Sequence, residues 1–199
     1  MSLSLIVLLP GAYLLGSICF AIVFARLFGK PDPRQAGSGN PGSTNMLRVA
    51  GRGPAILTLL FDIGKAFIPI YILRLLEYDD SALALVGLAI FLGHLFPIWH
   101  RFHGGKGVAV YLGFYVAFWP LPGSVIVVLR LLLAVTSNYV SVAGMGAAIG
   151  ACIIMLALSS NVVVWFTSLA MAVLVVFCHR SNLANLAQGN EKILFKSRR

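Results

Sequence analysis

Two long stretches without charged side chains restrict most strongly what this chain can fold into. Leu3 to Ala25 contains no Asp, Glu, Lys, Arg or His across 23 residues, and Leu131 to Phe177 contains none across 47. A helix needs about 20 consecutive apolar residues to cross the hydrocarbon core of a bilayer. Charged residues make up 11% of the chain, against about 25% in soluble domains. The sequence therefore predicts an all-α, polytopic integral membrane protein with a single domain over residues 1–199.

Six apolar regions follow one another along the chain. They are Leu3–Phe28, Pro54–Leu76, Ser81–Trp99, Val108–Leu133, Asn138–Leu158 and Asn161–Cys178. The first lacks the basic residues that precede a secretory signal and is longer than a typical signal region, so we interpret it as an uncleaved span. The fourth contains PLPG, Pro120 to Gly123, which favours a break in the helix. We expect two short helices there, with arms of about 12 and 13 residues, and about seven helices in all.

The charges between these regions indicate how the chain crosses the membrane. Basic loops lie at Gly29–Gly53 and His100–Gly107, a basic tail at His179–Arg199 and an acidic turn at Glu77–Asp80. Lysines and arginines in short loops mark the cytoplasmic side, so the N-terminus is predicted outside and the C-terminus in the cytoplasm. The last two apolar regions cross the membrane twice. The tail and the second basic loop therefore lie on the same side of the membrane only if residues 108–135 enter and leave the membrane at that same side. The net charge of +9 is spread over these connections and does not indicate a nucleic-acid partner.

A polar loop of twelve residues, GSGNPGSTNMLR from Gly37 to Arg48, separates the first two apolar regions. Its glycine, hydroxyl and amide residues are Gly37, Ser38, Gly39, Asn40, Gly42, Ser43, Thr44 and Asn45. Glycines permit turns with positive φ and a close approach of the backbone to a ligand, and an arginine can bind two phosphate oxygens at once. Turn chemistry alone explains Asn-Pro-Gly, but less readily the hydroxyls, amides and arginine beside a membrane. The loop is a candidate anion-binding site.

The segment GHLFPIWHRFHGGKGVA, Gly93 to Ala109, offers similar chemistry. Glycines flank Lys106, and the helix that follows favours anions at its N-terminus. The pattern is not that of a nucleotide-binding P-loop. A flexible turn whose lysine faces lipid headgroups is the alternative interpretation.

A third polar stretch, HRSNLANLAQGNEK from His179 to Lys192, leaves the last apolar region. Its alternative interpretation is an interfacial helix end with a basic tail, to which Lys196, Arg198 and Arg199 are assigned. Glu191 is the only carboxylate after Asp80, and we interpret it as a structural tie to a lysine or arginine of a loop. Ser141 belongs to a polar entry to the next-to-last helix on the same side.

Other candidate residues favour structural interpretations. Asp62 and Lys65 lie three residues apart on one helix face. Charges inside a membrane suggest function, but such partners also neutralise each other, and we interpret the pair as structural. His94 either bonds a backbone carbonyl or packs. The remaining histidines and the three cysteines lack metal-ligand spacing, so we expect no metal and no cofactor.

The three polar stretches together resemble the motifs of one family. GSGNPGSTNMLR, GHLFPIWHRFHGGKGVA and, more loosely, HRSNLANLAQGNEK are similar to those of the bacterial acyl-phosphate-dependent glycerol-3-phosphate acyltransferases, the PlsY family. The likeness covers essentially the whole chain in length, span pattern and motif order. Val110 stands where the family often has threonine.

The resemblance implies transfer of a fatty acyl group from acyl phosphate to the 1-hydroxyl of glycerol 3-phosphate, which gives lysophosphatidate and phosphate, the first acylation of bacterial phospholipid synthesis. The implied location is the bacterial cytoplasmic (inner) membrane, with the active site facing the cytoplasm. The implied partners are both substrates, the lipid bilayer and an upstream enzyme that forms acyl phosphate.

The resemblance also assigns site residues by motif. The residues expected to hold glycerol 3-phosphate for catalysis are Ser38, Arg48, Lys106, His179 and Asn182. Those expected to bind the acyl-phosphate group are Gly39, Asn40, Gly42, Ser43, Thr44, Asn45, Gly104, Gly105 and Gly107, with Ser141 as a further addition.

The acids and bases of the chain narrow the mechanism. No aspartate follows Asp80, so neither a histidine–aspartate pair nor a Ser-His-Asp triad is supported. Acyl phosphate is already activated, and we expect direct attack by the substrate hydroxyl, with positioning and charge stabilisation supplying the rate. The proton goes to the phosphate of the donor or to His179, and we favour the phosphate.

Two other classes of function are weighed against acyl transfer. A small transporter of phosphorylated solutes would often show inverted repeats and helices broken near the midplane, whereas here the polar motifs cluster at one surface. A non-enzymatic lipid-binding or assembly protein would not need converging cations and hydroxyls. We therefore favour the enzyme.

Overall fold

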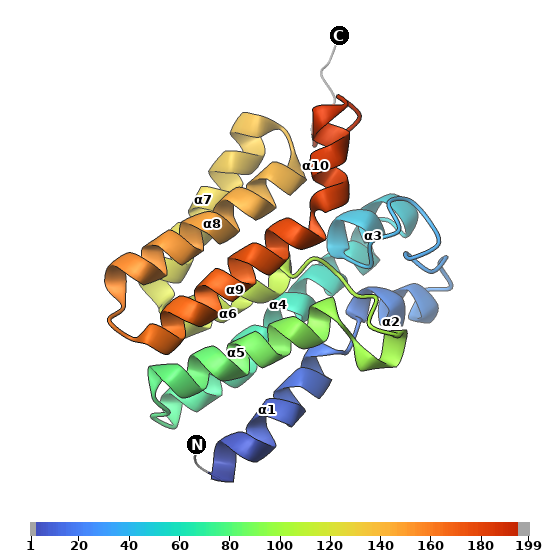
Figure 1. Ribbon diagram of the computed structural model, residues 1–199. Helices are drawn as coiled ribbons and strands as arrows, with labels where there is room; N and C mark the ends of the chain where they lie inside the picture. Colours follow the sequence, from blue (N-terminus) through green and yellow to red (C-terminus); the bar gives the residue numbers. More distant parts are fainter. Residues whose placement is uncertain (1–2, 195–199) are drawn as a thin grey trace.

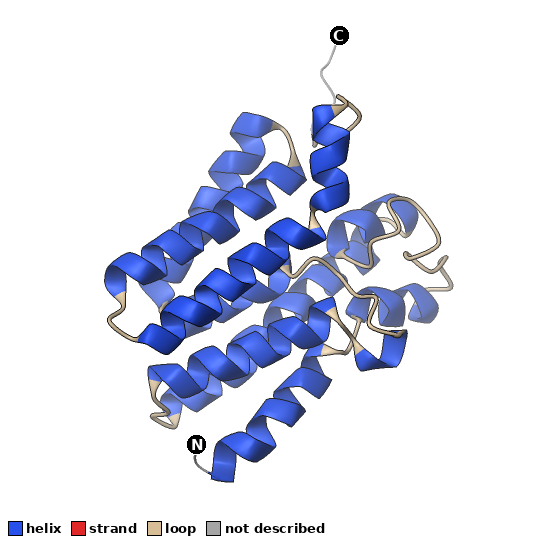
Figure 2. Cartoon of the chain, viewed as in Figure 1, coloured by secondary structure: helices blue, strands red, loops and turns tan. Residues whose placement is uncertain are grey.

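The computed structural model describes residues 3–194 of the chain, and Lys196, Arg198 and Arg199 of the basic tail lie outside them. Within that range the chain forms ten α-helices, one 3₁₀ turn and no strand (Figures 1 and 2). They are α1 (Leu3–Gly16), α2 (Phe20–Leu27), α3 (Ser43–Val49), α4 (Arg52–Leu75), α5 (Asp80–Leu95), η1 (Ile98–His100), α6 (Val108–Phe118), α7 (Pro120–Ser137), α8 (Val140–Leu158), α9 (Val162–Cys178) and α10 (Arg180–Ala187). The all-α prediction is confirmed.

Four of these helices have the length and composition to cross a membrane on their own, and two bent helix pairs raise the number of candidate spans to six. The four single helices are α4, α5, α7 and α8. The bent pairs are α1–α2 and α9–α10, and each adds one span if the pair is counted as one. Side chains on the outer faces are exposed and apolar, as at Val128, Ile153 and Phe166. The prediction of a polytopic membrane protein is thereby confirmed.

The first apolar region, which the sequence predicted as an uncleaved span, is bent by 43° between α1 and α2. The Ser17 hydroxyl donates to Tyr13 O over 2.9 Å, and the Ile22 N–H donates to Cys19 O over 3.0 Å. A Cβ on Gly16 would lie 2.1 Å from Ile90 O. Glycine at this position therefore lets α1 end against the backbone of α5.

The predicted break in the fourth region occurs, but one residue before PLPG. Trp119 is extended (φ −138, ψ 100), and Pro120 opens α7. Proline suits the first turn of a helix because its missing N–H has no intrahelical partner there. PLPG is thus the first turn of α7 rather than a turn between two equal arms, and α6 and α7 have 11 and 18 residues.

The core is built from the aromatic face of α6. Tyr111, Phe114, Tyr115 and Phe118 are each at most 1% exposed. Helices in a membrane associate through close packing of small residues rather than through the hydrophobic effect. Gly87 illustrates this, because a Cβ there would lie 2.2 Å from the Phe114 ring.

The polar segments gather at one end of the bundle. Figure 1 shows α3, α10 and the connection from α5 to α6 at that end, with the α4–α5 and α8–α9 turns at the other. The far end is tied by Asn161 Nδ2, which donates to Ser81 Oγ over 2.9 Å. Two short helices that the sequence did not predict, α3 and α10, lie within the polar segments. The shared end agrees with the proposed topology, whose orientation in the membrane stays a prediction.

Candidate functional site

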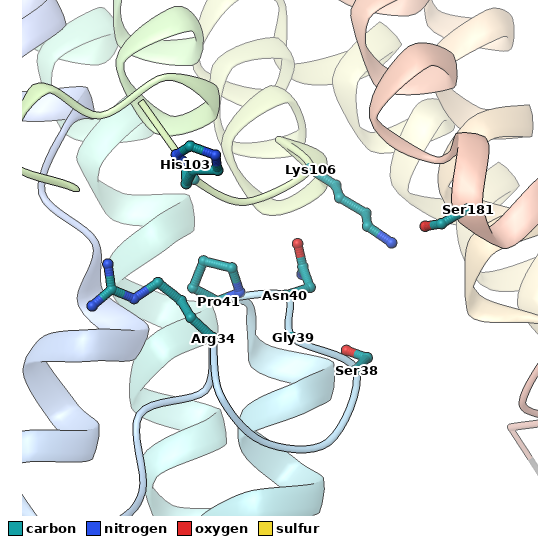
Figure 3. A pocket seen from close by; sticks show the side chains of 9 residues that line it. Arg34, Ser38, Gly39, Asn40, Pro41, His103, Lys106 and Ser181 are labelled. Atoms are coloured by element: carbon teal, nitrogen blue, oxygen red, sulfur yellow. The ribbon is translucent and has the colours of Figure 1, made fainter. Parts of the chain in front are cut away.

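A cavity of about 340 Å³ opens where the three polar segments meet (Figure 3). It is lined by Arg34, Ser38, Gly39, Asn40, Pro41, His103, Gly104, Lys106 and Ser181. In Figure 3 the Lys106 side chain extends toward Ser181, across from Asn40 and Ser38. Segments far apart in the sequence therefore enclose one cationic, hydroxyl-bearing space, as the sequence predicted.

The first polar loop is folded around the side chain of Asn45. Its Oδ1 accepts from the Ser38 N–H over 2.8 Å, and its Nδ2 donates to Pro33 O and Ala36 O over 2.8 and 2.9 Å. The side chain is 1% exposed. Asn45 therefore holds Ser38 at the cavity, and we reassign it from substrate binding to positioning.

Several backbone amides expected to bind phosphate are used within the chain. Gly39 and Gly42 donate to Ala36 O and Asn40 O, at 3.2 and 2.9 Å. Gly104 and Gly105 donate to Leu95 O and His94 O, each at 3.1 Å. These four N–H groups are therefore already used as donors within the chain, and the expected role of these residues in binding the acyl-phosphate group stays a prediction. Gly42, Ser43 and Thr44 lie at the start of α3, beside the lining residues.

The second segment carries Lys106 on a tightly packed turn. Gly107 has a φ of +81 and caps α6, a conformation that glycine adopts without strain. A Cβ on Gly104 would lie 2.0 Å from His94 O. Glycines here are thus required by close packing as well as by turn geometry.

The Lys106 ammonium donates a hydrogen bond to Asn182 Oδ1 in the third segment. Burial lowers the pKa of Lys106, the nearby charge of Glu191 opposes this shift, and the positive charge of Arg48 adds to it. Arg48 is exposed on α3 and is not among the lining residues. The two cations predicted from the sequence therefore act on each other, but only Lys106 lines the cavity.

Glu191 connects the third segment to α8. Its Oε1 accepts from Ser141 Oγ and from Asn182 Nδ2, each over 2.7 Å. The predicted contact between Glu191 and a cation is indirect, because Asn182 hydrogen-bonds to both Glu191 and Lys106. Ser141 is buried, is not among the lining residues of the cavity, and donates its hydroxyl hydrogen bond to Glu191.

His179 lies directly after α9 and is 4% exposed. Its Nδ1 lies 2.8 Å from Val175 O, so Nδ1 carries the ring proton and donates it, and Nε2 keeps a lone pair. Burial lowers the pKa of His179 to about 4. The imidazole is therefore neutral at neutral pH.

Four lining residues were not among the predicted site residues: Arg34, Pro41, His103 and Ser181. Arg34 forms an ion pair with Asp32, with Nη2 2.7 Å from Oδ2, and this bond lowers the pKa of Asp32. The signal for Arg34 was its place shortly before the first motif, and Pro41, His103 and Ser181 lay inside the three polar stretches. Within residues 3–194, no three His, Cys, Asp or Glu side chains come together as a metal site.

The fold and the site define a helical membrane protein with a cavity at one end of its bundle that is lined by cationic and hydroxyl-bearing side chains. The family model described as glycerol-3-phosphate acyltransferase matches residues 6–189. The chain belongs to the glycerol-3-phosphate acyltransferase family.

Individual relatives match over nearly the whole chain. The glycerol-3-phosphate acyltransferase of Halorhodospira halophila is 44% identical, covering 94% of both chains. That of Thioalkalivibrio sulfidiphilus is 41% identical over 92% of this chain and 91% of the relative. Membership of an acyltransferase family decides between the enzyme and its two alternatives.

Two solved structures share the fold. The glycerol 3-phosphate form of PlsY (YgiH), an integral membrane glycerol 3-phosphate acyltransferase, has a TM-score of 0.91 and 36% identity and covers 98% of this chain and 96% of that one. Its lysophosphatidic acid form has a TM-score of 0.85 and 34% identity, with 96% and 95% covered.

Proposed function

We propose that the protein transfers a fatty acyl group from acyl phosphate to the 1-hydroxyl of glycerol 3-phosphate, releasing lysophosphatidate and inorganic phosphate. The observation that carries this is the cavity where Ser38, Lys106 and Ser181 meet. Both substrates carry a phosphoryl group, which a lysine ammonium and hydroxyls bind. The relatives support the acceptor and product, because one solved neighbour is a glycerol 3-phosphate form and the other a lysophosphatidic acid form.

Glycerol 3-phosphate is held by the side chains around Lys106. The ammonium binds the phosphate, and Asn182 directs it through the hydrogen bond to Oδ1. Ser38 supplies a hydroxyl at the rim, and Arg48 approaches from α3 when the anion arrives. His179, neutral and with a free Nε2, accepts a hydrogen bond from the glycerol moiety.

The reaction is a direct displacement. The substrate hydroxyl oxygen forms a bond to the acyl carbon, the bond from that carbon to the phosphate oxygen breaks, and the hydroxyl proton passes to the departing phosphate. The carboxylate nearest to Lys106 along this network, Glu191, already accepts hydrogen bonds from Ser141 and Asn182, which disfavours it as a base. Rate enhancement comes from positioning and from the cation that faces the developing charge.

The acyl chain of the donor enters from the bilayer, and the amphiphilic product leaves into it. The basic connections gathered at the cavity end favour a cytoplasmic position of this end. We place the protein in the bacterial cytoplasmic membrane, where an upstream enzyme that makes acyl phosphate supplies the donor.

The test is an assay of purified protein with palmitoyl phosphate and glycerol 3-phosphate, in which phosphate and lysophosphatidate are both quantified. We expect the two products in equal amounts. Palmitoyl-CoA and palmitoyl-acyl-carrier protein are offered in parallel as donors. Lysophosphatidate formed only from one of these thioesters would contradict the proposed donor while leaving the acceptor unaffected.

A further inference from the structure

Asp62, Lys65 and His94 form a buried cluster that the proposed chemistry leaves unused. Lys65 Nζ lies 2.9 Å from Asp62 Oδ1 and 2.9 Å from His94 Nδ1. The three residues are 2%, 5% and 5% exposed. The predicted pairing of Asp62 with Lys65 is confirmed. Charged side chains inside membrane helices are costly and usually functional, so the cluster calls for a role beyond packing.

Lys65 also binds the backbone where the first span bends. Its Nζ donates to Gly16 O over 3.1 Å and to Ile18 O over 2.9 Å. In an unbroken helix these carbonyls would accept from the N–H groups four residues later, but the Ile22 N–H donates to Cys19 O instead. The lysine therefore replaces helical hydrogen bonds that the bend removes.

The first polar loop touches the chain just past this bend. Cys19 precedes α2 and places its Sγ 4.0 Å from Pro41 O. Pro41 is buried and lines the cavity next to Asn40. A shift of the bend relative to α4 would therefore move the cavity wall that carries Asn40.

His94 extends the same cluster to the second polar segment. The His94 carbonyl accepts from the Gly105 N–H over 3.1 Å, and a Cβ on Gly105 would lie 2.3 Å from the Nε2 of His94. The ring thus lies directly against the residue before Lys106. Its orientation is fixed from the other side, because Nδ1 accepts from the Lys65 ammonium.

We propose that Lys65 is a positioning residue for glycerol 3-phosphate binding. It fixes the bend of the first span and, through His94, the turn that carries Lys106, so that the two polar segments face each other across the cavity. Four acceptors lie within 3.1 Å of Nζ, and an ammonium has three N–H donors. The hydrogen-bonding capacity of the ammonium is therefore fully used. An uncharged side chain cannot bind both the carbonyls at the bend of the first span and the His94 ring. The inference rests on the proposed position of glycerol 3-phosphate in the cavity.

The test is the paired substitution Asp62→Asn/Lys65→Met, which removes both charges and leaves no unpaired ion in the membrane. We expect the KM and the Kd for glycerol 3-phosphate to rise by about tenfold or more, since misplacing a binding group by about 1 Å costs up to about 10²-fold. A merely structural role would lower the melting temperature and leave KM unchanged. A folded double variant with KM within about twofold of wild type would overturn the proposal.

Arg74→Met is the matched control. Arg74 is another cation of α4, and its Nη1 donates to Phe118 O at the far end of the bundle. We expect this variant to lose melting temperature and to keep its KM. An equal rise of KM in Arg74→Met would show that any destabilisation of α4 suffices, and would overturn the specific role of Lys65.

His94→Gln retains both charges and is the milder variant if the double variant does not fold. We expect its KM to rise as well, by about threefold or more, because the turn before Lys106 loses the ring that supports it. An unchanged KM in this variant would overturn the coupling through His94. Wild-type protein that binds no glycerol 3-phosphate in a calorimetric titration would overturn the proposed site, and this inference with it.

Discussion

The ammonium of Lys106 donates a hydrogen bond to the Oδ1 of Asn182, 76 positions further along the chain. Asn182 Nδ2 in turn donates to Glu191 Oε1 over 2.7 Å. The second and third polar segments are therefore one unit before any substrate arrives. A lysine that is already oriented loses little freedom when a phosphate binds, which favours tight binding.

Removing the charge at Lys106 tests the anion site itself. We expect Lys106→Met to raise the KM for glycerol 3-phosphate and to lower kcat/KM by about 10- to 100-fold, because a hydrogen bond to a charged group contributes about 1.5–3 kcal/mol. The measurement is steady-state kinetics of lysophosphatidate formation. Lys30→Met, at an exposed lysine outside the cavity lining, is the control, and equal kinetics for the two variants would refute the assignment.

The buried lysine also predicts a pH dependence. Burial lowers the pKa of Lys106 below the usual 10.5, and the ammonium is the form that binds phosphate. As the pH rises through this lowered pKa, we expect kcat/KM for glycerol 3-phosphate to fall, starting below 10.5. Lys106→Arg stays charged over this range, so its profile should remain flat if the variant is active; the same alkaline fall in both proteins would contradict the prediction.

The lowered pKa of Lys106 affects stability and activity in opposite directions: as the pH rises, we expect the activity to fall and the contribution of Lys106 to stability to increase. Between the lowered pKa and 10.5, the unfolded chain binds more protons at Lys106 than the folded protein does. The contribution of Lys106 to stability is therefore highest above 10.5 and is lost as the pH falls through the folded-state pKa. Comparing the melting temperatures of wild type and Lys106→Met across this window measures the pH-dependent contribution of Lys106 to stability. A difference in melting temperature that does not change with pH would contradict the prediction.

Direct attack predicts that no imidazole base is essential. His179 is neutral, with a pKa of about 4 and its Nδ1 bonded to Val175 O. His179→Gln retains a polar side chain, and we expect more than a few per cent of wild-type kcat to remain, with a raised KM. Activity below about 10⁻³ of wild type in a folded variant would instead indicate general base catalysis.

Close packing of the second polar segment predicts a contrast between two glycines. A Cβ at Gly105 would lie 2.3 Å from the His94 ring, whereas nothing lies within 4 Å of a Cβ at Gly53. Gly105→Ala should therefore lower the melting temperature and the activity, because overpacking costs about 1–3 kcal/mol. Gly53→Ala should leave both close to wild type, and equal losses in the two variants would show that the packing argument is wrong.

The spans and the cavity end could be predicted from the sequence because their signals are local. Uncharged runs long enough to cross a bilayer identify the helices, and glycine-rich stretches around Ser38 and Lys106 identify two walls of the cavity. The polar segments also indicated which connections share one end of the bundle.

The remaining features depend on contacts between distant residues. The bend after Gly16 is held by a lysine 49 positions away, which no local pattern reveals. Asn45 and Asn40 look alike in the sequence, yet one is used by the loop itself and the other lines the cavity. Arg34 lies outside the recognised motif and reaches the cavity only because the loop folds back.

The position of the substrate phosphate is best tested by a crystal structure of the protein with glycerol 3-phosphate bound. We expect the phosphate within hydrogen-bonding distance of Lys106 Nζ, in the cavity lined by Ser38 and Ser181. A phosphate bound at another surface, with this cavity still empty at saturating ligand, would show that the cavity around Lys106 is not the glycerol 3-phosphate site.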